Sequence, residues 1–447
     1  MSAVDRDLAE PAAPADLRAA APAPDEAGRR DWTPRQIYVL GLLTVISMFN
    51  YLDRNLLGMV LPLIKRELHL SDTVLGLVTG IVFVLFYSLL GVPIASLADR
   101  SNRKLIISIG FTFWSAMTVA TGFCANVWQL GIARFLMGAG EACSLAPSNS
   151  MISDMFARHR RALAVAILSS SFALQSIVFA PVIGWASDQY GWRATFLLSG
   201  VPGLMVAILF FLTVREPART QTTAADRETV PIGTALRFLL GSRAFVLMVL
   251  AGAFMGGALY GSGNWLTTFL VRVHHLSLTD IGAKYAPPRG VAALIGILLA
   301  GYLSDRLGKV DGRWRVWAPA ICCALLAPAQ FLLSLSDSPV GWIGGMLGLS
   351  FLLTAYQAPV YAAVMNVARP RMRAVGVSVL VLTTGILGQL LGPLVVGVLN
   401  DHLHATYGDA AIRYSMLVVG LCGLGGAVCL FGAGYFLEAD GRRAAES

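Results

Sequence analysis

The chain has 447 residues, of which 56% are hydrophobic and only 13% are charged, and its formal net charge is +8. A soluble domain carries about 25% charged residues, so this composition excludes an ordinary soluble protein and indicates a membrane protein. The positive charge does not indicate nucleic-acid binding, because the Lys and Arg residues lie between long apolar runs. The six cysteines lack metal-ligand spacing and are interpreted as small core residues.

Residues 1–33 consist mainly of Ala, Pro, Asp and Arg, which predicts a disordered tail rather than a signal peptide. Twelve apolar segments follow, and each is long enough to cross a bilayer, which takes about 20 helical residues. They cover approximately residues 36–63, 73–98, 104–123, 128–153, 161–186, 194–214, 243–270, 280–303, 315–335, 340–366, 373–399 and 412–437. The predicted fold class is therefore an all-α membrane protein with twelve transmembrane helices.

One long hydrophilic connection, residues 215–242, divides these segments into six plus six. It predicts two six-helix bundles, over 34–214 and 243–437, and a tail over 438–447. Cytoplasmic loops of membrane proteins carry the excess of Lys and Arg. Twenty-five of these residues lie on the side of the N-terminus, five on the opposite side and four inside the segments. Both termini and the connection are therefore expected in the cytoplasm.

The two halves resemble each other in sequence. LADRSNRK after the second segment matches LSDRLGK after the eighth, so that Asp99 corresponds to Asp305. RRALAV matches MRAVGV, with Arg161 corresponding to Arg373, and APVIG matches GPLVVG at the same offset as this second match. The three matches lie at nearly one offset. Internal duplication of this kind is typical of secondary transporters, which place the substrate site between the repeats.

Charged side chains occur inside the first and fourth segments. SMFNYLDRNLLG carries Asn50, Asp53 and Arg54, which share one helix face through their i, i+3 and i+4 spacing. In the fourth segment, Arg134 and Glu141 are two helical turns apart on one face. An ionised group at mid-bilayer costs at least about 2.5–3.5 kcal/mol and is functional by default, although a static ion pair that orders the two helices is the alternative.

The whole region 36–437 resembles the major facilitator superfamily. The family signature G-x-x-x-D-R-x-G-R/K-R/K is intact in the second half, at Gly301, Asp305, Arg306, Gly308 and Lys309. The first-half copy has Ala95 and Asn102 where glycines are usual, and it keeps Asp99, Arg100, Arg103 and Lys104. The resemblance implies a cytoplasmic gate formed by Asp99, Arg100, Arg103, Asp154, Asp305 and Arg306.

Two further motifs resemble the Spinster family of lysolipid and sphingosine-phosphate transporters. One is N-Y-x-D-R in the first segment, and the other is G-E-A followed by Pro147 and S-D-x-F in the fourth. N-Y-x-D-R also resembles the organic anion–proton symporters, so a transporter of hexuronate-like small carboxylates is the alternative. The sequence around Glu141 favours the Spinster family.

The resemblance implies that segments 1, 4, 7 and 10 line a central cavity. A carboxylate beside an arginine that can move away would bind and release a proton, which gives Asp53, Glu141 and Arg134 a role in proton coupling. The candidate pairs are Asp53 with Arg134 or Arg54, and Glu141 with Arg134. Guanidinium groups bind phosphate or carboxylate through two parallel hydrogen bonds, so Arg54 and Arg134, with Asn50, are expected to bind a substrate headgroup.

The second half offers aromatic and weakly polar side chains instead of charges. Its candidates for lining the cavity are Tyr260, Asn264, Trp265, Tyr356, Gln357 and Tyr361, and the first segment adds Tyr51. A cavity with one charged and one aromatic wall suits an amphipathic substrate, although aromatic residues in membrane helices also pack on their neighbours. Lys284 and Arg289 could either reach the membrane surface or attract an anionic lipid.

The sequence therefore predicts a proton-coupled secondary transporter of lysophospholipid-like or sphingosine-phosphate-like molecules that works by alternating access. Its expected partners are this lipid-like substrate and protons, without nucleic acid, cofactor or metal. An enzyme is disfavoured because no metal cluster, phosphate-binding loop or nucleophile motif is visible in the sequence. A non-transporting receptor would not need Asp53, Arg134 and Glu141 together. The expected location is the plasma membrane, in a bacterium the inner membrane, and the expected state is a monomer.

Overall fold

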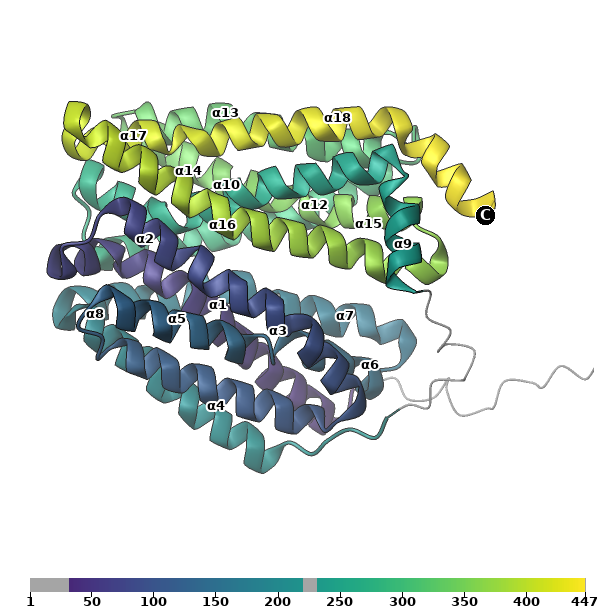
Figure 1. The fold of residues 1–447 in the computed structure, drawn as a ribbon, viewed down its shortest axis with the longest axis horizontal. Coiled ribbons are helices and arrows are strands. Elements are labelled where there is room, and N and C mark those ends of the chain that lie inside the picture. Colours follow the sequence, from purple (N-terminus) through teal and green to yellow (C-terminus); the bar gives the residue numbers. More distant parts are fainter. Residues whose placement is uncertain (1–31, 220–230, 447) are drawn as a thin grey trace, which may run out of the picture.

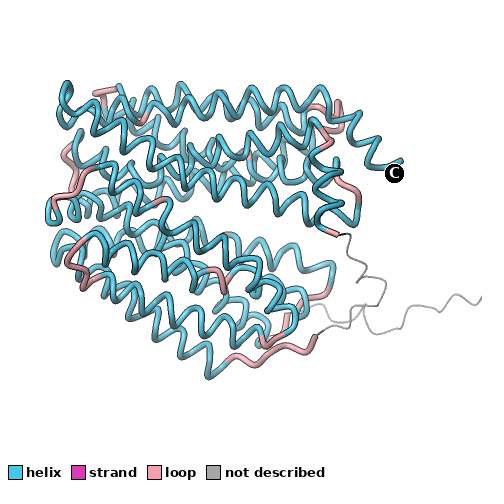
Figure 2. Tube along the Cα trace, viewed as in Figure 1, coloured by secondary structure: helices cyan, strands magenta, loops and turns pink. Residues whose placement is uncertain are grey.

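The computed structural model describes residues 32–219 and 231–446, apart from a few side chains within the helices. The predicted tail over residues 1–33 lies almost wholly outside this part. Within it, every regular element is a helix (Figure 2), which confirms the all-α fold class. The predicted connection over 215–242 contains a helix, α9, that the sequence analysis did not anticipate.

The helices of the N-terminal half follow one another with short turns (Figure 1). They are α1 (Pro34–Leu68), α2 (Asp72–Thr79), α3 (Ile81–Arg100), α4 (Arg103–Thr121), α5 (Val127–Glu141), α6 (Leu145–Met155), α7 (Arg158–Ser169) and α8 (Ser171–Thr213).

The C-terminal half repeats this arrangement. Its elements are α9 (Ile232–Leu240), α10 (Arg243–His274), α11 (Leu278–Asp280), the π-helix η2 (Ile281–Tyr285), α12 (Ala286–Leu307), α13 (Trp314–Leu335), α14 (Pro339–Ala355), α15 (Gln357–Val367), η3 (Pro370–Met372), α16 (Arg373–Tyr407), η4 (Gly408–Ala410), α17 (Ala411–Ser415) and α18 (Leu417–Glu446). The final helix continues to residue 446, past the predicted segment end at 437.

Local sequence determines where α1 begins and ends. The Thr33 hydroxyl accepts a hydrogen bond from the Gln36 backbone at 3.2 Å, and the Gln36 side chain accepts one from the Thr33 backbone at 2.9 Å. Pro34 occupies the first helical turn, where its missing N–H costs nothing. The helix ends at His69, which is left-handed with φ 51°. His275 ends α10 in the same way with φ 53°, at the offset that relates Asp99 to Asp305.

Nine stretches of the described residues are long and apolar enough to cross a membrane. Two of them, Leu163–Thr213 and Pro370–Ala445, each cover two of the predicted segments. Within the first, Gly191 turns the chain through a φ of 77° and a ψ of 173°, a conformation that favours glycine. The predicted segment 128–153 is divided between α5 and α6 by a turn at residues 142–144. The count of twelve remains a prediction.

The helices pack in two groups that follow the two halves of the sequence. In Figure 1, α4, α5 and α8 lie in the lower group, and α10, α16 and α18 in the upper group. The start of α1 lies beside the end of α6, where Trp32 packs edge-on against Phe156. We call this side of the molecule, which also carries α9 and the end of α18, the terminal end, and the opposite side the distal end (Figure 1).

Helices α10 and α16 approach so closely that glycine is required between them. A Cβ atom added at Gly388 would overlap the backbone of Gly256, and one at Gly392 would lie 2.5 Å from the Gly257 carbonyl oxygen. Small residues allow such close packing in membrane proteins, where dispersion contacts replace the hydrophobic effect. This contact joins the two longest helices of the C-terminal half.

Gly388→Ala is therefore expected to lower the melting temperature of the purified protein. Overpacking of a tight contact costs about 1–3 kcal/mol, which exceeds the gain of about 1 kcal/mol from alanine in a helix. Gly385→Ala is the matched control on the same helix, because a Cβ atom there meets nothing within 4 Å. Equal melting temperatures of the two variants would contradict the assigned contact.

At the distal end, the two halves meet through two equivalent helix crossings. In one, α2 crosses α16, and Asp401 accepts hydrogen bonds from the backbone of Asp72 at 3.0 Å and of Thr73 at 2.8 Å. In the other, α11 crosses α8, and Asp188 accepts from the backbone of Leu278 at 3.3 Å and of Thr279 at 2.7 Å. Each aspartate thus caps the start of a helix that belongs to the other half.

The same crossings use glycines at repeat-related positions. A Cβ atom at Gly397 would overlap the Asp72 carbonyl oxygen, and one at Gly184 would overlap the Leu278 carbonyl oxygen. Asp188 and Gly184 of α8 correspond to Asp401 and Gly397 of α16, and both pairs have the same offset in the sequence. The residues that they meet are related by the offset between His69 and His275. The internal duplication predicted from sequence therefore builds two matching contacts that close the distal end.

Candidate functional site

A buried ion pair joins the two helices that carry the predicted membrane charges. The Arg54 Nε atom of α1 lies 2.8 Å from the Glu141 Oε2 atom at the end of α5. The Glu141 side chain is fully buried, and that of Arg54 is 15% exposed. The second carboxylate oxygen, Oε1, has no hydrogen-bond partner among the described residues. Such an ion pair is stable only while both partners stay in place.

The Arg54 guanidinium also lies over two aromatic rings of α3. Its Cζ atom is 4.4 Å from the ring centroid of Tyr87 and 5.2 Å from that of Phe83. The electron-rich face of an aromatic ring attracts a cation, and a guanidinium is weakly hydrated. The sequence analysis missed both rings. Their i, i+4 spacing on one helix face was the signal that could have found them.

Asp53 and Arg134 lie next to this pair, and both are buried. The Arg134 Nη1 atom donates to the backbone carbonyl of Asp53 at 3.0 Å, not to its carboxylate. The Asp53 Oδ1 atom and the Arg134 Nε atom have no hydrogen-bond partner among the described residues. Trp114 and Thr118 of α4 are the side chains beside the carboxylate. Asp53 is therefore a buried carboxylate without an ion pair to any described residue.

The structure corrects the pairings that the sequence analysis expected. Glu141 pairs with Arg54 rather than with Arg134, and Asp53 pairs with neither arginine. The reason is the direction of the side chains around α1. Asp53 and Arg54 point about 100° apart, so only Arg54 reaches the end of α5. Asn50 is buried one turn before Arg54 on the same face.

Several of the predicted lining residues gather around Arg54. The hydroxyl groups of Tyr51 and Tyr260 are close enough to the guanidinium to interact with it electrostatically. Tyr361 of α15 lies near both tyrosines and accepts a hydrogen bond from Gln357 Nε2 at 3.1 Å. Tyrosines of the two halves thus surround one arginine. Tyr260 was one of the side chains of the second half predicted to line the cavity.

Three other lining predictions need correction. Trp265 is fully buried, and its indole N–H donates to the Pro393 carbonyl at 2.9 Å, so it packs between helices. Tyr356 is 2% exposed and therefore does not line an open cavity in this structure. Asn264 donates to the Tyr260 carbonyl at 2.8 Å on its own helix. Burial between helices removes all three side chains from open space.

The predicted gate residues at the terminal end form contacts within one half. Arg103 pairs with Asp154 and with Glu216, whose Oε1 atom lies 2.7 Å from Arg103 Nε. Glu216 was not predicted, because it follows α8 in an irregular segment. Arg100 is exposed, and Arg306 donates to the Tyr302 hydroxyl at 3.2 Å. The side chains of Asp99 and Asp305 lie outside the described part of the structure.

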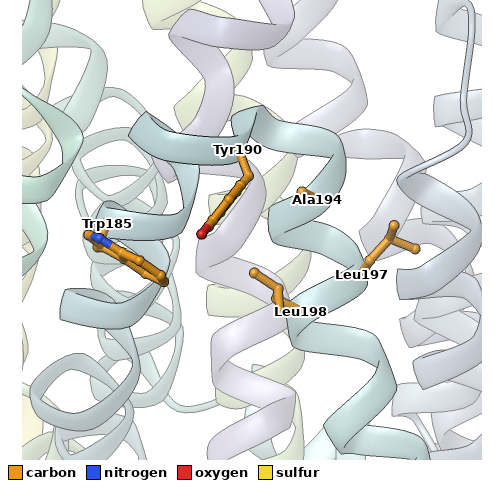
Figure 3. Close-up of a pocket in the computed structure, with 5 residues that line it drawn as sticks. All are labelled: Trp185, Tyr190, Ala194, Leu197 and Leu198. Carbon is orange, nitrogen blue, oxygen red and sulfur yellow. The ribbon is translucent and has the colours of Figure 1, made fainter.

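An apolar hollow lies on the surface of α8, beside the turn at Gly191. Figure 3 shows the residues that line it, which are Trp185, Tyr190, Ala194, Leu197 and Leu198. The rings of Trp185 and Tyr190 pack edge-on, 5.5 Å apart. Exposed Trp and Tyr residues are typical of the membrane–water interface. No charged residue lines this hollow. It shares no residue with the group of Arg54, Glu141, Asp53, Arg134 and their aromatic neighbours, which we call the Arg54 cluster.

The described residues contain no group of His, Cys, Asp or Glu side chains suited to a metal ion. The site provides two carboxylates, two arginines and tyrosine hydroxyls. These groups can exchange protons and bind anions. They come from α1, α3, α5 and α10.

Comparisons with known proteins place this arrangement in a family. The Major Facilitator Superfamily model matches residues 43–393. The chain is 30% identical to an MFS-type efflux pump of Mycolicibacterium smegmatis, over 90% of this chain and 92% of the pump. It is 28% identical to the sphingosine-1-phosphate transporter SPNS2 of Danio rerio, over 89% of this chain and 84% of that protein.

A solved structure has the same fold. It is the inward-facing, unoccupied crystal structure of a bacterial homolog of the human lysosomal transporter Spinster. The TM-score is 0.80 and the sequence identity 28%, and the match covers 92% of this chain and 99% of the other. The resemblance to the Spinster family is thereby confirmed. This chain belongs to the Major Facilitator Superfamily and is a membrane transporter rather than an enzyme.

Proposed function

We propose that this chain is a proton-coupled secondary transporter of amphipathic, lipid-like molecules with a phosphorylated or zwitterionic headgroup. The observation that carries the proposal is the buried Arg54–Glu141 pair beside the unpaired carboxylate of Asp53. Arg54 neutralises Glu141 and leaves the buried Asp53 carboxylate without an ion pair to any described residue, so the two carboxylates are not both neutralised. One of them is therefore free to take up a proton.

Coupling follows from competition for Arg54. A headgroup phosphate binds a guanidinium through two parallel hydrogen bonds and displaces the Glu141 carboxylate. Glu141, left in a buried position without its cation, takes up a proton. When the substrate leaves, the proton is released and the ion pair forms again. A second proton site is provided by Asp53, which directly precedes Arg54 on α1, and by Arg134, two turns before Glu141 on α5.

The substrate class is supported by the surroundings of the pair. The tyrosines at positions 51, 87, 260 and 361 supply aromatic rings that can pack against an apolar chain and hydroxyl groups that can bind a headgroup. SPNS2, a sphingosine-1-phosphate transporter, is 28% identical to this chain. A phosphorylated single-chain lipid combines the two features that the cluster would recognise.

Alternating access fits the contacts between the halves. The distal crossings hold the halves together, so opening toward the terminal end is the complementary state. The excess of Lys and Arg on this side supports a cytoplasmic terminal end, and in a bacterium the membrane would be the inner membrane. The bundles over 34–214 and 243–437 are the moving bodies, and one chain contains both.

The proposal is tested by uptake of a labelled lysophospholipid into liposomes that contain the purified protein. Uptake driven by an imposed pH gradient is expected for the wild type. Asp53→Asn is expected to bind the lipid but to lose the dependence on the gradient, because asparagine cannot carry the proton. Arg134→Ala is expected to weaken both lipid binding and gradient-driven uptake, because the Arg134 side chain donates a hydrogen bond to the backbone carbonyl of Asp53.

Asp337→Asn is the matched control, because Asp337 forms an exposed ion pair with Arg413 far from the cluster. If the wild type takes up a hexuronate in preference to lysophospholipid, the proposed lipid substrate is wrong and the substrate is a small organic anion. Wild-type behaviour of both cluster variants would show that the buried charges only order the helices.

A further inference from the structure

One arginine inside the membrane region has neither an ion pair nor a neighbouring carboxylate among the described residues. Arg289 lies in α12, within the candidate span Leu278–Ser304, and it is half-buried. It forms no ion pair with any described residue, and its Nε atom donates a long hydrogen bond of 3.3 Å to the Ser350 hydroxyl of α14. Lys284, one turn closer to the distal end, is exposed and pairs with Asp280 at 2.8 Å.

The repeat register identifies the position of Arg289 in the N-terminal half. One constant offset relates three pairs of residues that serve the same structural purpose, namely His69 and His275, Ser71 and Ser277, and the close-packed glycines Gly76 and Gly282. The same offset relates Arg289 to residue 83 and Tyr260 to residue 54.

These equivalent positions are the ones that face each other in the Arg54 cluster. Arg54 of α1 lies over the ring of Phe83 of α3. In the C-terminal half, the aromatic residue is on α10, as Tyr260, and the cation is on α12, as Arg289. The duplication has kept both positions and exchanged the helix that carries the charge.

Neighbouring contacts support this equivalence. Gly138 of α5 packs against the Phe83 carbonyl, and Ser350, which contacts Arg289, corresponds to Gly138 at the offset that relates Arg161 to Arg373. The residue after Arg289, Gly290, faces α8 of the other half, where an added Cβ would lie 3.1 Å from the Ala173 carbonyl oxygen. Arg289 is thus close to the interface of the halves, where superfamily duplications place their substrate site.

A guanidinium in this environment needs an anion. A charged group inside the membrane is costly without a partner, and Arg carries five N–H donors, of which one is used here. Arg54 is neutralised by Glu141, and Arg134 has two carboxylates nearby. Arg289 is the membrane arginine whose charge no described carboxylate balances.

We propose that Arg289 and Ser350 form a second anion-binding site, which binds the acidic phosphate of an amphipathic substrate and selects headgroups with net negative charge. The inference rests on the proposed transport of phosphorylated lipids and adds a preference to it. A zwitterionic phosphocholine brings its own cation to the site and gains less from Arg289. A phosphomonoester has no such cation and gains most.

The first experiment measures binding to the purified protein in detergent, by quenching of tryptophan fluorescence. The probes are dodecyl phosphate and dodecylphosphocholine, which share a chain and differ in net charge. Arg289→Gln is expected to weaken binding of dodecyl phosphate by about tenfold or more, the loss of one charge-assisted hydrogen-bonded contact. It should change dodecylphosphocholine binding less than threefold. Arg289→Lys should restore part of the affinity.

Lys284→Gln is the matched control, because it removes a nearby positive charge that already has a carboxylate partner. Ser350→Ala should weaken dodecyl phosphate binding modestly and in the same direction. Equal losses for both probes in Arg289→Gln, or no loss for either, would overturn the proposal. So would an equal effect of Lys284→Gln.

The second experiment separates this inference from the proposed function. Uptake of lysophosphatidic acid and lysophosphatidylcholine is compared in liposomes that contain wild type or Arg289→Gln. A higher KM for the first lipid alone supports both statements. The wild type could transport neither lipid while Arg289→Gln still binds dodecyl phosphate more weakly than the wild type does. In that case the anion-binding site is supported and the proposed lysolipid transport is wrong.

Discussion

Replacing Glu141 with glutamine is expected to abolish accumulation of substrate against its gradient, while exchange of substrate across the membrane continues. Glutamine fills the same volume but cannot bind and release a proton. It also leaves Arg54 without its anion, at a buried position where the rings of Tyr87 and Phe83 remain beside it. The ratio of internal to external substrate at steady state should fall to unity.

The measurement uses liposomes with an imposed pH gradient for accumulation and preloaded liposomes for exchange. Asp337→Asn should keep both activities, because its partner Arg413 lies at the exposed distal surface. Full accumulation by Glu141→Gln would exclude Glu141 as the coupling carboxylate and leave Asp53 as the other carboxylate beside Arg54 and Arg134. Loss of exchange together with accumulation would assign Glu141 to substrate binding instead.

The same ion pair makes a prediction about stability. Removing one partner of a buried pair costs about 3–5 kcal/mol, whereas replacing both by apolar residues is often neutral. Glu141→Leu alone should therefore lower the melting temperature more than Glu141→Leu combined with Arg54→Met. Additive effects of the two changes would mean that the pair is not coupled.

Replacing Asp72 with alanine is expected to open the distal end. Asp72 of α2 accepts two hydrogen bonds from Arg272 of α10, at 2.7 and 2.8 Å, so it joins the two halves directly. Lys65 adds a third contact at 2.7 Å from within the N-terminal half. Loss of a buried ion pair costs about 3–5 kcal/mol, and about 5.5 kcal/mol reverses a 99:1 population.

The two aspartates that cap helices of the opposite half should have smaller effects. Loss of a helix cap costs about 0.5–2 kcal/mol, so Asp188→Ala and Asp401→Ala should each shift the population several-fold. Asp401→Ala should exceed Asp188→Ala, because Asp188 is exposed and water replaces its contacts more easily. The shift toward the open distal end is therefore expected to be largest for Asp72→Ala, smaller for Asp401→Ala and smallest for Asp188→Ala.

Spin labels at the distal starts of α5 and α14 would measure this opening. Trp128 and Val340 are suitable positions, because they are 80% and 85% exposed and lie one in each half. Both become cysteines in a background without the native six, and the distribution of label distances is recorded. The fraction of long label-to-label distances is expected to increase from Asp188→Ala to Asp401→Ala to Asp72→Ala. Asp337→Ala, which breaks a distal ion pair inside one half, should leave the distribution unchanged.

The sequence by itself determined the membrane class, the two related halves and the helices that carry buried charges. Uninterrupted apolar runs of about 20 residues form helices in lipid, because a helix gives every backbone group a partner within the segment. Motif spacing alone placed Asp53, Arg54, Arg134 and Glu141 in two such helices. These are local properties, readable from one stretch of chain at a time.

Only the tertiary structure decided which charges meet. Arg54 rather than Arg134 pairs with Glu141, because helix rotation and side-chain length determine which of two neighbouring groups reaches across. The same holds for Tyr87 and Phe83 beneath Arg54, for Trp265 buried against Pro393, and for Asp401 and Asp188 at the starts of helices in the other half. Such contacts join residues that are far apart in the chain; Asp72 and Asp401, for example, are 329 residues apart. Helix periodicity gives the face that a residue occupies, but the packing of the whole bundle selects its neighbour.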